Sequence, residues 1–291
     1  MTFQRPFTFT KQIILGLLFL TVSHPGLCAE NVFDSHVHLW NGEASIKEYL
    51  SQLERDHQDV AGFGGILIAR PGEIDRTRQK NDELIALAKR YPKLMPIASV
   101  HPYDGAAARE ELKRVAGAGV KVIKLHPHTQ EFAVADPRVL ELCRLAGTLR
   151  VMVLVDNANI VPGDSQDLFN LAVKCPDTQF IFAHLGALNF RFWNILWAAR
   201  TAKDFYKENI HFDISAIVTL VAGSPLEKEF VWTMHTVGID NIILGSDFPQ
   251  FSLKASVDAL ERLDLDATEK AKIRYGNAQR LFFSDGKPAK P

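Results

Sequence analysis

The chain has 291 residues, of which 47% are hydrophobic and 23% are charged, and its formal net charge at pH 7 is −1. This composition is that of a globular protein with one large domain or two small ones, and it excludes disordered and collagen-like chains. This near-neutral charge balance does not point to a polyanionic partner, so we expect a small-molecule partner and no nucleic acid.

The first 29 residues are predicted to be a secretory signal peptide. Arg5 and Lys11 precede an apolar run, IILGLLFLTV (13–22), and the small residue Ala29 stands where cleavage is expected. A membrane anchor is the alternative, but a run of this length is too short for a bilayer core, which needs about 20 apolar residues. We therefore expect no stable membrane span after cleavage.

The mature chain is predicted to be residues 30–291, exported to the periplasm or secreted. A lipoprotein acylated at Cys28 is the weaker alternative, because Leu27 stands where a small residue is expected. Cleavage would remove two basic residues and no acidic one, which moves the net charge from −1 to −3. It would leave Cys143 and Cys175 without metal-type spacing; we predict buried thiols, although an oxidising compartment could pair them.

After Ala29, short β-branched runs alternate about eight times with longer helical patterns. The runs predicted as strands are VFDSHVHL (32–39), GGILIA (64–69), LMPIASV (94–100), VKVIKLH (120–126), VMVLVD (151–156), QFIFAH (179–184), NIHFDIS (209–215) and NIILGSD (241–247). The helical patterns between them, several of which end at Gly or Pro, include NDELIALAKRYP (81–92), AAAREELKRVAGAG (106–119), DPRVLELCRLAG (136–147), LFNLAVKCP (168–176) and ASVDALERL (255–263).

This alternation predicts an α/β fold with a single (β/α)8 TIM barrel over residues 30–291. Continuous apolar strands are typical of a parallel sheet that helices cover on its outer face. Eight such units in about 260 residues fit one closed barrel better than an open doubly wound sheet. The open sheet also lacks its usual chemistry, because no glycine-rich dinucleotide fingerprint follows the first strand.

Polar residues gather where the predicted strands end. In a TIM barrel these carboxyl ends form the active face, and buried polar groups are costly unless they are paired or coordinated. The residues concerned are His36, His38, His101, Lys124, His126, His128, Asp156, His184, Asp213 and Asp247.

His36 and His38 are predicted to bind a divalent metal ion together. Side chains alternate across a strand, so residues two apart point the same way, and both imidazoles would face the barrel mouth. Barrel closure would bring Asp247 to them and add a hard oxygen ligand. The alternative is that one or both histidines only hydrogen-bond to neighbouring loops.

These motifs resemble the amidohydrolase superfamily, specifically its amidohydrolase-related branch of metal-dependent barrel hydrolases and decarboxylases. The resemblance runs from Asn31 to Phe283 through FDSHVHLW, VKVIKLHP, FIFAHLGAL, IHFDISA, IILGSDFP and YGNAQRLF, in this order. It implies that His36, His38 and Asp247 are metal ligands. It also implies that Asp247 accepts a proton from the attacking water, and that His184 contacts substrate or metal.

One position departs from the family pattern. Asp156 ends the fifth predicted strand, where the resemblance implies a histidine. A carboxylate can still bind a divalent ion, so we predict Asp156 as a further protein ligand beside the two histidines and Asp247. The same departure leaves open a relative that has lost its metal.

Lys124 and His126 are predicted to bind the substrate. For Lys124, a contact to a substrate anion or a salt bridge inside the barrel is favoured over carbamylation, which the resemblance would also allow. We expect Asp213 to cap or hydrogen-bond within the mouth, and His101 and His128 to be loop residues. An aromatic substrate wall and simple packing are equally supported for four residues: Trp40, Phe190, Phe192 and Trp193.

The predicted activity is that of a metal-dependent hydrolase. A bound divalent ion, with zinc favoured and manganese as the alternative, lowers the pKa of its water to about 7 for attack on an amide, ester or lactone. Non-oxidative decarboxylation of a small carboxylic acid is the runner-up on the same site. An exported non-catalytic binding protein is a further alternative, and a homo-oligomer is left open.

Overall fold

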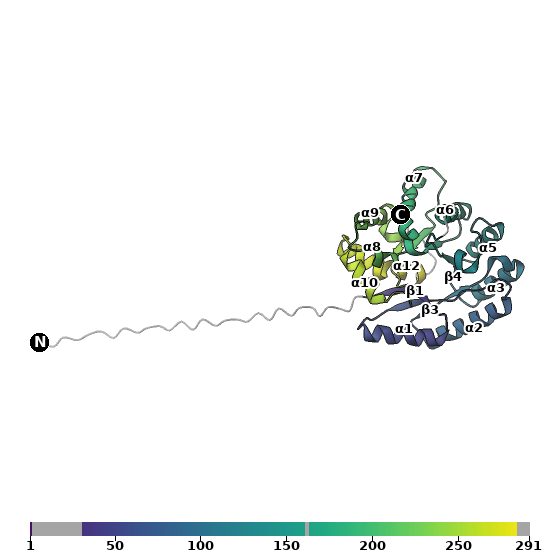
Figure 1. Cartoon of the computed structure of the whole chain (residues 1–291), viewed down its shortest axis with the longest axis horizontal. Helices are drawn as coiled ribbons and strands as arrows, with labels where there is room; N and C mark the ends of the chain where they lie inside the picture. Colours follow the sequence, from purple (N-terminus) through teal and green to yellow (C-terminus); the bar gives the residue numbers. More distant parts are fainter. Residues whose placement is uncertain (2–30, 161–162, 284–291) are drawn as a thin grey trace. The chain divides into compact units, whose positions relative to one another are not determined.

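The computed structural model describes residues 31–160 and 163–283, together with Met1 (Figure 1). Within these residues, eight strands form one parallel sheet in the order of the chain. They are β1 (Phe33–His38), β2 (Gly62–Ile66), β3 (Leu94–Ser99), β4 (Val122–Leu125), β5 (Met152–Val155), β6 (Phe180–Phe182), β7 (Ile210–Asp213) and β8 (Ile242–Ile243). Each overlaps one predicted strand, while the predicted signal peptide lies outside the described residues apart from Met1.

The segment after β8 returns to β1 and closes the sheet into a barrel. The backbone N–H of Ser35 donates to the carbonyl of Leu244 (3.0 Å), and the N–H of Asp247 donates to the carbonyl of His36 (2.9 Å). The strand NIILGSD was predicted as seven residues, but only two pair as β8. Leu244 and Asp247, which follow β8, make this closing contact instead, and the eight-stranded parallel sheet is consistent with the predicted (β/α)8 barrel.

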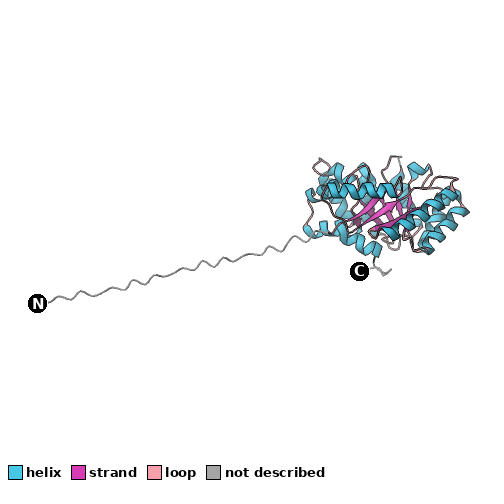
Figure 2. Cartoon of the chain, turned by 90° about the horizontal axis from the view of Figure 1, so that it is seen from below, coloured by secondary structure: helices cyan, strands magenta, loops and turns pink. Residues whose placement is uncertain are grey.

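Helices surround the strands on the outer side, as the view coloured by secondary structure makes clear (Figure 2). They are α1 (Glu43–Arg55), α2 (Ile74–Arg90), α3 (Ala106–Gly117), α4 (Pro127–Gln130), α5 (Pro137–Thr148), α6 (Asp164–Lys174), α7 (Ile195–Thr201), α8 (Ile217–Val221), α9 (Glu227–Val237), α10 (Leu253–Arg262), α11 (Ala267–Ala271) and α12 (Asn277–Phe283). Short 3-10 turns, including η2 (Ala183–Asn194), and the π-helical turn η4 (Lys272–Gly276) connect them.

Helix α2 begins seven residues before the predicted pattern. The two core-facing positions at its start carry Thr77 and Asn81, which are buried but polar and so hide the apolar periodicity. Asn81 has a structural role there: its amide donates to the carbonyl of Ser99 (3.0 Å) and to Glu111 (2.7 Å). A buried amide with these partners ties α2 to the end of β3 and to α3.

On β4 and β5 the interior of the barrel changes from apolar to polar along the strand. On β5 the side chains that face inward are Met152 and Leu154, and the next residue of this alternation is Asp156. On β4, Val122 is followed in the same way by Lys124. The period of two that defines a strand therefore delivers apolar side chains to one end of the barrel and ionisable ones to the other.

The cysteines and the length of the apolar helices bear on the chain's environment. Cys143 and Cys175 are both free and buried, as the sequence predicted. Among the described residues, no helix is long and apolar enough to cross a membrane.

Candidate metal centre at the mouth of the barrel

Three side chains from distant parts of the chain converge at the carboxyl end of the barrel. His36, His184 and Asp247 are buried, and each offers one ligand atom within 4.8 Å of the others. His38 and Asp156 lie at the edge of this group: His38 Nε2 is 3.3 Å from Asp247 Oδ1, and Asp156 Oδ1 is 3.2 Å from His184 Nε2. The structure thus brings together all five residues that were predicted as ligands or catalytic groups.

His36 sits deepest in this group and is fully buried. Its Nδ1 lies 2.9 Å from Asp213 Oδ2, and its Nε2 lies 3.3 Å from Lys124 Nζ and 3.5 Å from Asp247 Oδ1. Because the Asp213 carboxylate can only accept, Nδ1 is the ring nitrogen that holds the proton. The lone pair on Nε2 therefore faces the mouth.

His38 lies above His36 and under Trp40. The two rings stack with centroids 4.7 Å apart and an angle of 5° between their planes. Trp40 is 51% exposed, so its other face is open to solvent. Of the four aromatic residues weighed for a substrate wall, Trp40 is the one left at the mouth, because Phe190 and Trp193 are fully buried and Phe192 packs against the core.

Asp156 and His184 form a buried pair next to His126. The carboxylate of Asp156 also lies 3.7 Å from His126 Nδ1. His126 is largely held by Thr129, whose N–H donates to Nδ1 (3.3 Å) and whose hydroxyl meets Nε2 (3.2 Å). His126 is thus at the rim of the site rather than in its centre.

The backbone after β6 takes an unusual path that presents His184 to the site. His184, Leu185 and Gly186 are all left-handed, with φ of 60°, 46° and 82°. A Cβ on Gly186 would approach Trp193 Nε1 to 2.9 Å, so only glycine satisfies both the conformation and the packing there. Trp193 in turn donates to Asn157 Oδ1 (3.0 Å), which joins this turn to the loop after β5.

Burial keeps the two histidines of β1 neutral. It lowers the pKa of His36 to about 4 and that of His38 to about 3, and the charge of Lys124 adds to both shifts. The pKa of Lys124 is itself lowered by burial, although the neighbouring carboxylates oppose this. At pH 7 each imidazole of β1 therefore keeps a lone pair for a cation.

The Asp156–His184 pair behaves in the opposite way. Burial acts against charge on His184, but the hydrogen bond and charge of Asp156 outweigh it and raise the pKa of His184 to about 9. Burial also acts against the Asp156 carboxylate, yet His184, His126 and Lys124 hold the pKa of this carboxyl well below its usual range. Without a metal ion, His184 therefore carries a second proton, and its positive charge balances the negative charge of Asp156.

The residues present fit a divalent metal ion. With His184 neutral, three carboxylates (Asp156, Asp213 and Asp247) face the single cation of Lys124, and a divalent ion would balance the surplus of two negative charges. Imidazole nitrogen and carboxylate oxygen together suit zinc or manganese. The buried His38 Nδ1, which has no hydrogen-bond partner among the described residues, leaves its ring free to turn toward such an ion.

Two residues that hold the site were undervalued or missed from the sequence. Asp213 was expected only to hydrogen-bond in the mouth, and it proves to be the partner of His36. Ser215 was not singled out, yet its hydroxyl lies 3.2 Å from His36 Nδ1 and 3.1 Å from His184 Nδ1. The available signal was their spacing: residues two apart at the end of β7 point the same way, as His36 and His38 do.

The two remaining histidines stay outside the centre, as expected. His101 Nε2 donates to the carbonyl of Gln130 (2.6 Å), and its Nδ1 accepts from the N–H of Tyr103 (3.1 Å). These bonds tie the loops after β3 and β4 together. His128 is exposed in α4.

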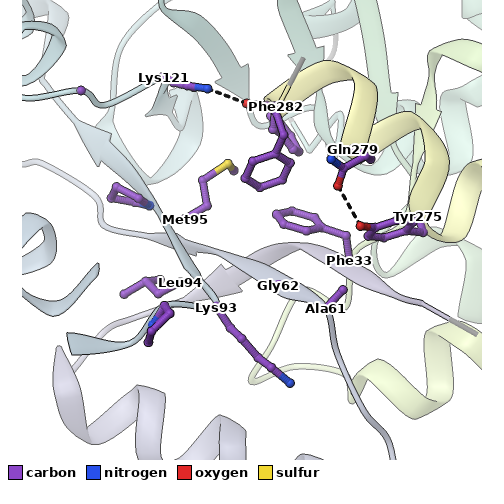
Figure 3. A pocket seen from close by; sticks show the side chains of 14 residues that line it. Phe33, Ala61, Gly62, Lys93, Leu94, Met95, Lys121, Tyr275, Gln279 and Phe282 are labelled. Atoms are coloured by element: carbon purple, nitrogen blue, oxygen red, sulfur yellow. Dashed lines mark hydrogen bonds between the residues drawn. The ribbon is translucent and has the colours of Figure 1, made fainter. Parts of the chain in front are cut away.

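A cavity of about 400 Å³ lies at the opposite end of the barrel (Figure 3). Phe33, Met95 and Phe282 line it, and Lys121 donates to the carbonyl of Phe282 at its edge (2.9 Å). None of the predicted site residues lines this cavity. Its size alone therefore gives no reason to move the candidate site away from the mouth.

Comparisons with known proteins agree with this fold. A gamma-resorcylate decarboxylase from Polaromonas sp. is 25% identical over 122 residues, which cover 38% of this chain and 35% of that enzyme. The alignment thus spans about a third of its length. Two solved structures are alike in fold over most of their length.

The first is a dihydroxybenzoic acid decarboxylase from Polaromonas with bound manganese, with 17% identity, a TM-score of 0.60, and coverage of 87% of this chain and 96% of that one. The second is a 4-oxalomesaconate hydratase from Rhodopseudomonas palustris, with 15% identity, a TM-score of 0.63, and coverage of 86% and 95%. At these identities the likeness establishes the fold alone.

The family model described as amidohydrolase matches residues 33–283, nearly the whole barrel. The match includes both histidines of β1, the turn after β6 and the closing segment with Asp247. The chain therefore belongs to the amidohydrolase family.

Proposed function

We propose that this chain is a metal-dependent enzyme that removes the carboxyl group of a small carboxylic acid without oxidation. The observation that carries the proposal is the convergence of His36, His184 and Asp247 beside the buried cation of Lys124. The sequence favoured hydrolysis over decarboxylation. The relatives named above reverse that order, since two of the three are decarboxylases.

Decarboxylation asks two things of the protein. The substrate loses CO₂ and keeps the bonding electrons on carbon, and that carbon must then receive one proton. A divalent ion at this site would bind the substrate and draw electron density from it as the carbon–carbon bond breaks. The side chains of the mouth must orient the carboxylate and move the proton.

Lys124 is suited to the first task. Its ammonium is buried at the centre of the mouth and can hold a substrate anion through a charge-assisted hydrogen bond. His126 at the rim would contact the same substrate. Burial of the lysine strengthens this interaction, because few water molecules compete for it.

Asp247 and His184 are suited to the second task. Both have side-chain atoms directed at the mouth and a neighbouring imidazole or carboxylate that can hold a proton. We assign the proton transfer to Asp247 and the polarisation of the substrate to His184. General acid–base groups of this kind contribute about 10²–10⁴-fold to rate.

We propose that His36, His38 and Asp247 bind the metal ion. Asp156 is the further ligand that the sequence predicts. The short Asp156–His184 distance makes His184 the competing ligand. Zinc is the ion favoured by the sequence, and manganese is supported by its presence in a Polaromonas relative.

Export is proposed on the sequence alone. The charged start, the apolar run and Ala29 support cleavage near Glu30 and a periplasmic or secreted mature protein. N-terminal sequencing of the native protein tests this. An intact Met1 terminus in a cytosolic fraction would contradict it.

Hydrolysis is the second candidate, because the same acceptors could orient a water molecule beside Asp247. A single panel separates the candidates: protein loaded with zinc or manganese is incubated with dihydroxybenzoates, other small carboxylic acids, lactones, esters and amides. Release of CO₂ with a product that lacks the carboxyl group supports the proposal, and His36→Ala should abolish it. Acid release from lactones or esters alone would favour a hydrolase, and bound ligand without turnover would favour a binding protein.

A further inference from the structure

Asp213 and Ser215 lie beneath both imidazoles of the centre. Both residues are fully buried. Ser215 Oγ is 3.2 Å from His36 Nδ1 and 3.1 Å from His184 Nδ1, and Asp213 Oδ2 is 2.9 Å from His36 Nδ1. Ser215, two residues after β7, thus contacts Nδ1 of both histidines. Asp213, the last residue of β7, contacts Nδ1 of His36 and accepts the backbone N–H of His184 (3.3 Å).

The hydroxyl of Ser215 has one proton, and its destination decides what the oxygen can do. Oγ donates that proton to Asp213 Oδ1, which also accepts the N–H of Ser215 (2.9 Å). An ionised carboxylate only accepts, so the serine proton is committed to it. Toward the two imidazoles, Oγ can therefore act only as an acceptor.

The other contacts of the two Nδ1 atoms require the same arrangement. His184 Nδ1 lies 3.0 Å from the carbonyl of Ser215, which cannot donate. His36 Nδ1 faces the Asp213 carboxylate, which cannot donate either. A lone pair on either Nδ1 would face only acceptor oxygens at hydrogen-bond distance, an arrangement that costs the energy of an unmade hydrogen bond.

We propose that Asp213 and Ser215 are positioning residues that keep a proton on Nδ1 of both imidazoles. The lone pair of His36 Nε2 then faces the mouth, and His184 Nε2, which lies 3.2 Å from Asp156 Oδ1, offers its lone pair once a metal ion replaces the proton that it shares with this carboxylate. One pair of residues at the end of β7 thereby orients two candidate ligands at once. The hydrogen positions follow from the donors and acceptors around each nitrogen. The position of the Nδ1 protons does not depend on the proposed function. The expected effect on metal affinity rests on it.

The backbone around Ser215 is shaped for this contact. Ala216 has φ 58° and ψ −56°, and the N–H of Ile217 donates back to the carbonyl of Ser215 (2.6 Å). This tight turn directs the carbonyl at His184. A conformation that a non-glycine residue rarely adopts is retained where the surrounding structure requires it.

Gly245 allows the close approach of the two layers. A Cβ at this position would lie 2.9 Å from the Cβ of His36 and 3.0 Å from the Cβ of Ser215. The residue that precedes the closing turn therefore has no side chain, and the histidine and the serine meet across it. A larger residue would separate the hydroxyl from the ring.

The proposal is tested by the nitrogen-15 spectrum of histidine-labelled protein, which distinguishes a protonated ring nitrogen from one with a free lone pair. In metal-free protein we expect His36 to carry its proton on Nδ1. In protein loaded with zinc or cadmium we expect His36 and His184 both to keep the Nδ1 proton and to bind through Nε2.

Single substitutions test whether Asp213 and Ser215 fix the position of these protons. Asp213→Asn places an amide donor beside His36, so we expect the proton of His36 to move to Nε2 and metal affinity to fall at least about 100-fold. Ser215→Ala should lower metal affinity about 10-fold, within the range for residues that orient ligands. Ser256→Ala is the matched control, since Ser256 is equally buried but its hydroxyl has no partner among the described residues; it should change neither readout.

The wild-type spectrum can overturn the proposal without any variant. A proton on His36 Nε2 in the metal-free protein would contradict it, and so would an unchanged His36 spectrum in a folded Asp213→Asn. If the protein takes up no metal, the proposed function fails, but the His36 spectrum still decides between the two tautomers. The two failures are therefore distinguishable.

Discussion

The two ends of the barrel are built from the same strands and have opposite character. At the amino end, Phe33 of β1, Met95 of β3 and Phe282 of α12 belong to one buried apolar cluster. At the carboxyl end of β1, three residues further on, His36 lies among carboxylates and Lys124. The difference indicates that the apolar end stabilises the barrel. The other end contains buried polar groups and strained backbone, whose cost in folding free energy the apolar end must offset.

A substitution at the mouth should change activity while leaving stability almost intact. Asp247→Asn removes the charge of a proposed ligand and its capacity to carry a proton, but it keeps the shape and the backbone bond to His36. We expect turnover to fall about 10²–10⁴-fold, which is the contribution of a general acid–base group. Turnover of metal-loaded protein and urea unfolding, measured together, check this.

An equally large change in unfolding free energy for Asp247→Asn would contradict the separation of the two ends. Ser256→Ala serves as the control for both measurements, because the buried hydroxyl of Ser256 has no hydrogen-bond partner among the described residues.

At the amino end the expected pattern is reversed. Phe282 is buried against Phe33, with ring centroids 5.4 Å apart, so Phe282→Ala should lower the free energy of unfolding by about 3–5 kcal/mol. Metal affinity per folded molecule should not change. Phe283→Ala is a matched control next in the chain, and because Phe283 is 45% exposed it should cost much less. Loss of metal from folded Phe282→Ala would show that the ends are coupled.

Asp156 tests how far the mouth departs from the family pattern. If its carboxylate is a ligand, Asp156→Asn should weaken metal binding at least about 10–100-fold, because a neutral amide oxygen is a poorer donor. Asp156→His should then keep or tighten binding. Calorimetric titration of both variants with zinc checks this.

Unchanged affinity in both Asp156 variants would remove Asp156 from the ligand set. The role would pass to His184, which already lies within 4.8 Å of the other two members of the group.

The apolar end and the strand order could be predicted from the sequence for a simple reason. Burial on both faces makes each strand a continuous apolar run, and eight of these runs leave few alternative folds. On β4 and β5 the inward row of side chains also fixes which polar residue reaches the mouth, as with Leu154 and Asp156. His36, His38 and Asp247 could therefore be assigned to one site before any geometry was known.

The partners of these residues could not be predicted in the same way. His184 enters the centre through three successive left-handed residues, a path that no periodicity encodes. Ser215 reaches the two imidazoles only because the curvature of the barrel brings β1, β6 and β7 together. The stacking of Trp40 on His38, and the burial of Trp193, likewise depend on how loops pack rather than on their composition.

The smallest effect is expected in the outer layer, at the two cysteines. Burial raises the pKa of the Cys175 thiol to about 11 and raises that of the Cys143 thiol well above its usual value. Only about a thousandth of Cys175 is then thiolate at pH 8, the form that reacts. We expect negligible labelling by a thiol reagent in native buffer, a rise as the pH approaches 11, and full labelling of both residues in urea. Rapid native labelling at pH 8 would show that this layer opens.

The closing seam of the barrel has a consequence for biosynthesis. His36 and Asp247 are joined by a backbone hydrogen bond as well as by their side chains, yet about 210 residues separate them. A ribosome that adds 5–20 residues per second needs roughly 10–40 s to pass from one to the other. Throughout that interval the nascent chain carries His36 and His38 without Asp247, so the order of synthesis prevents the proposed metal site from being complete before the barrel closes.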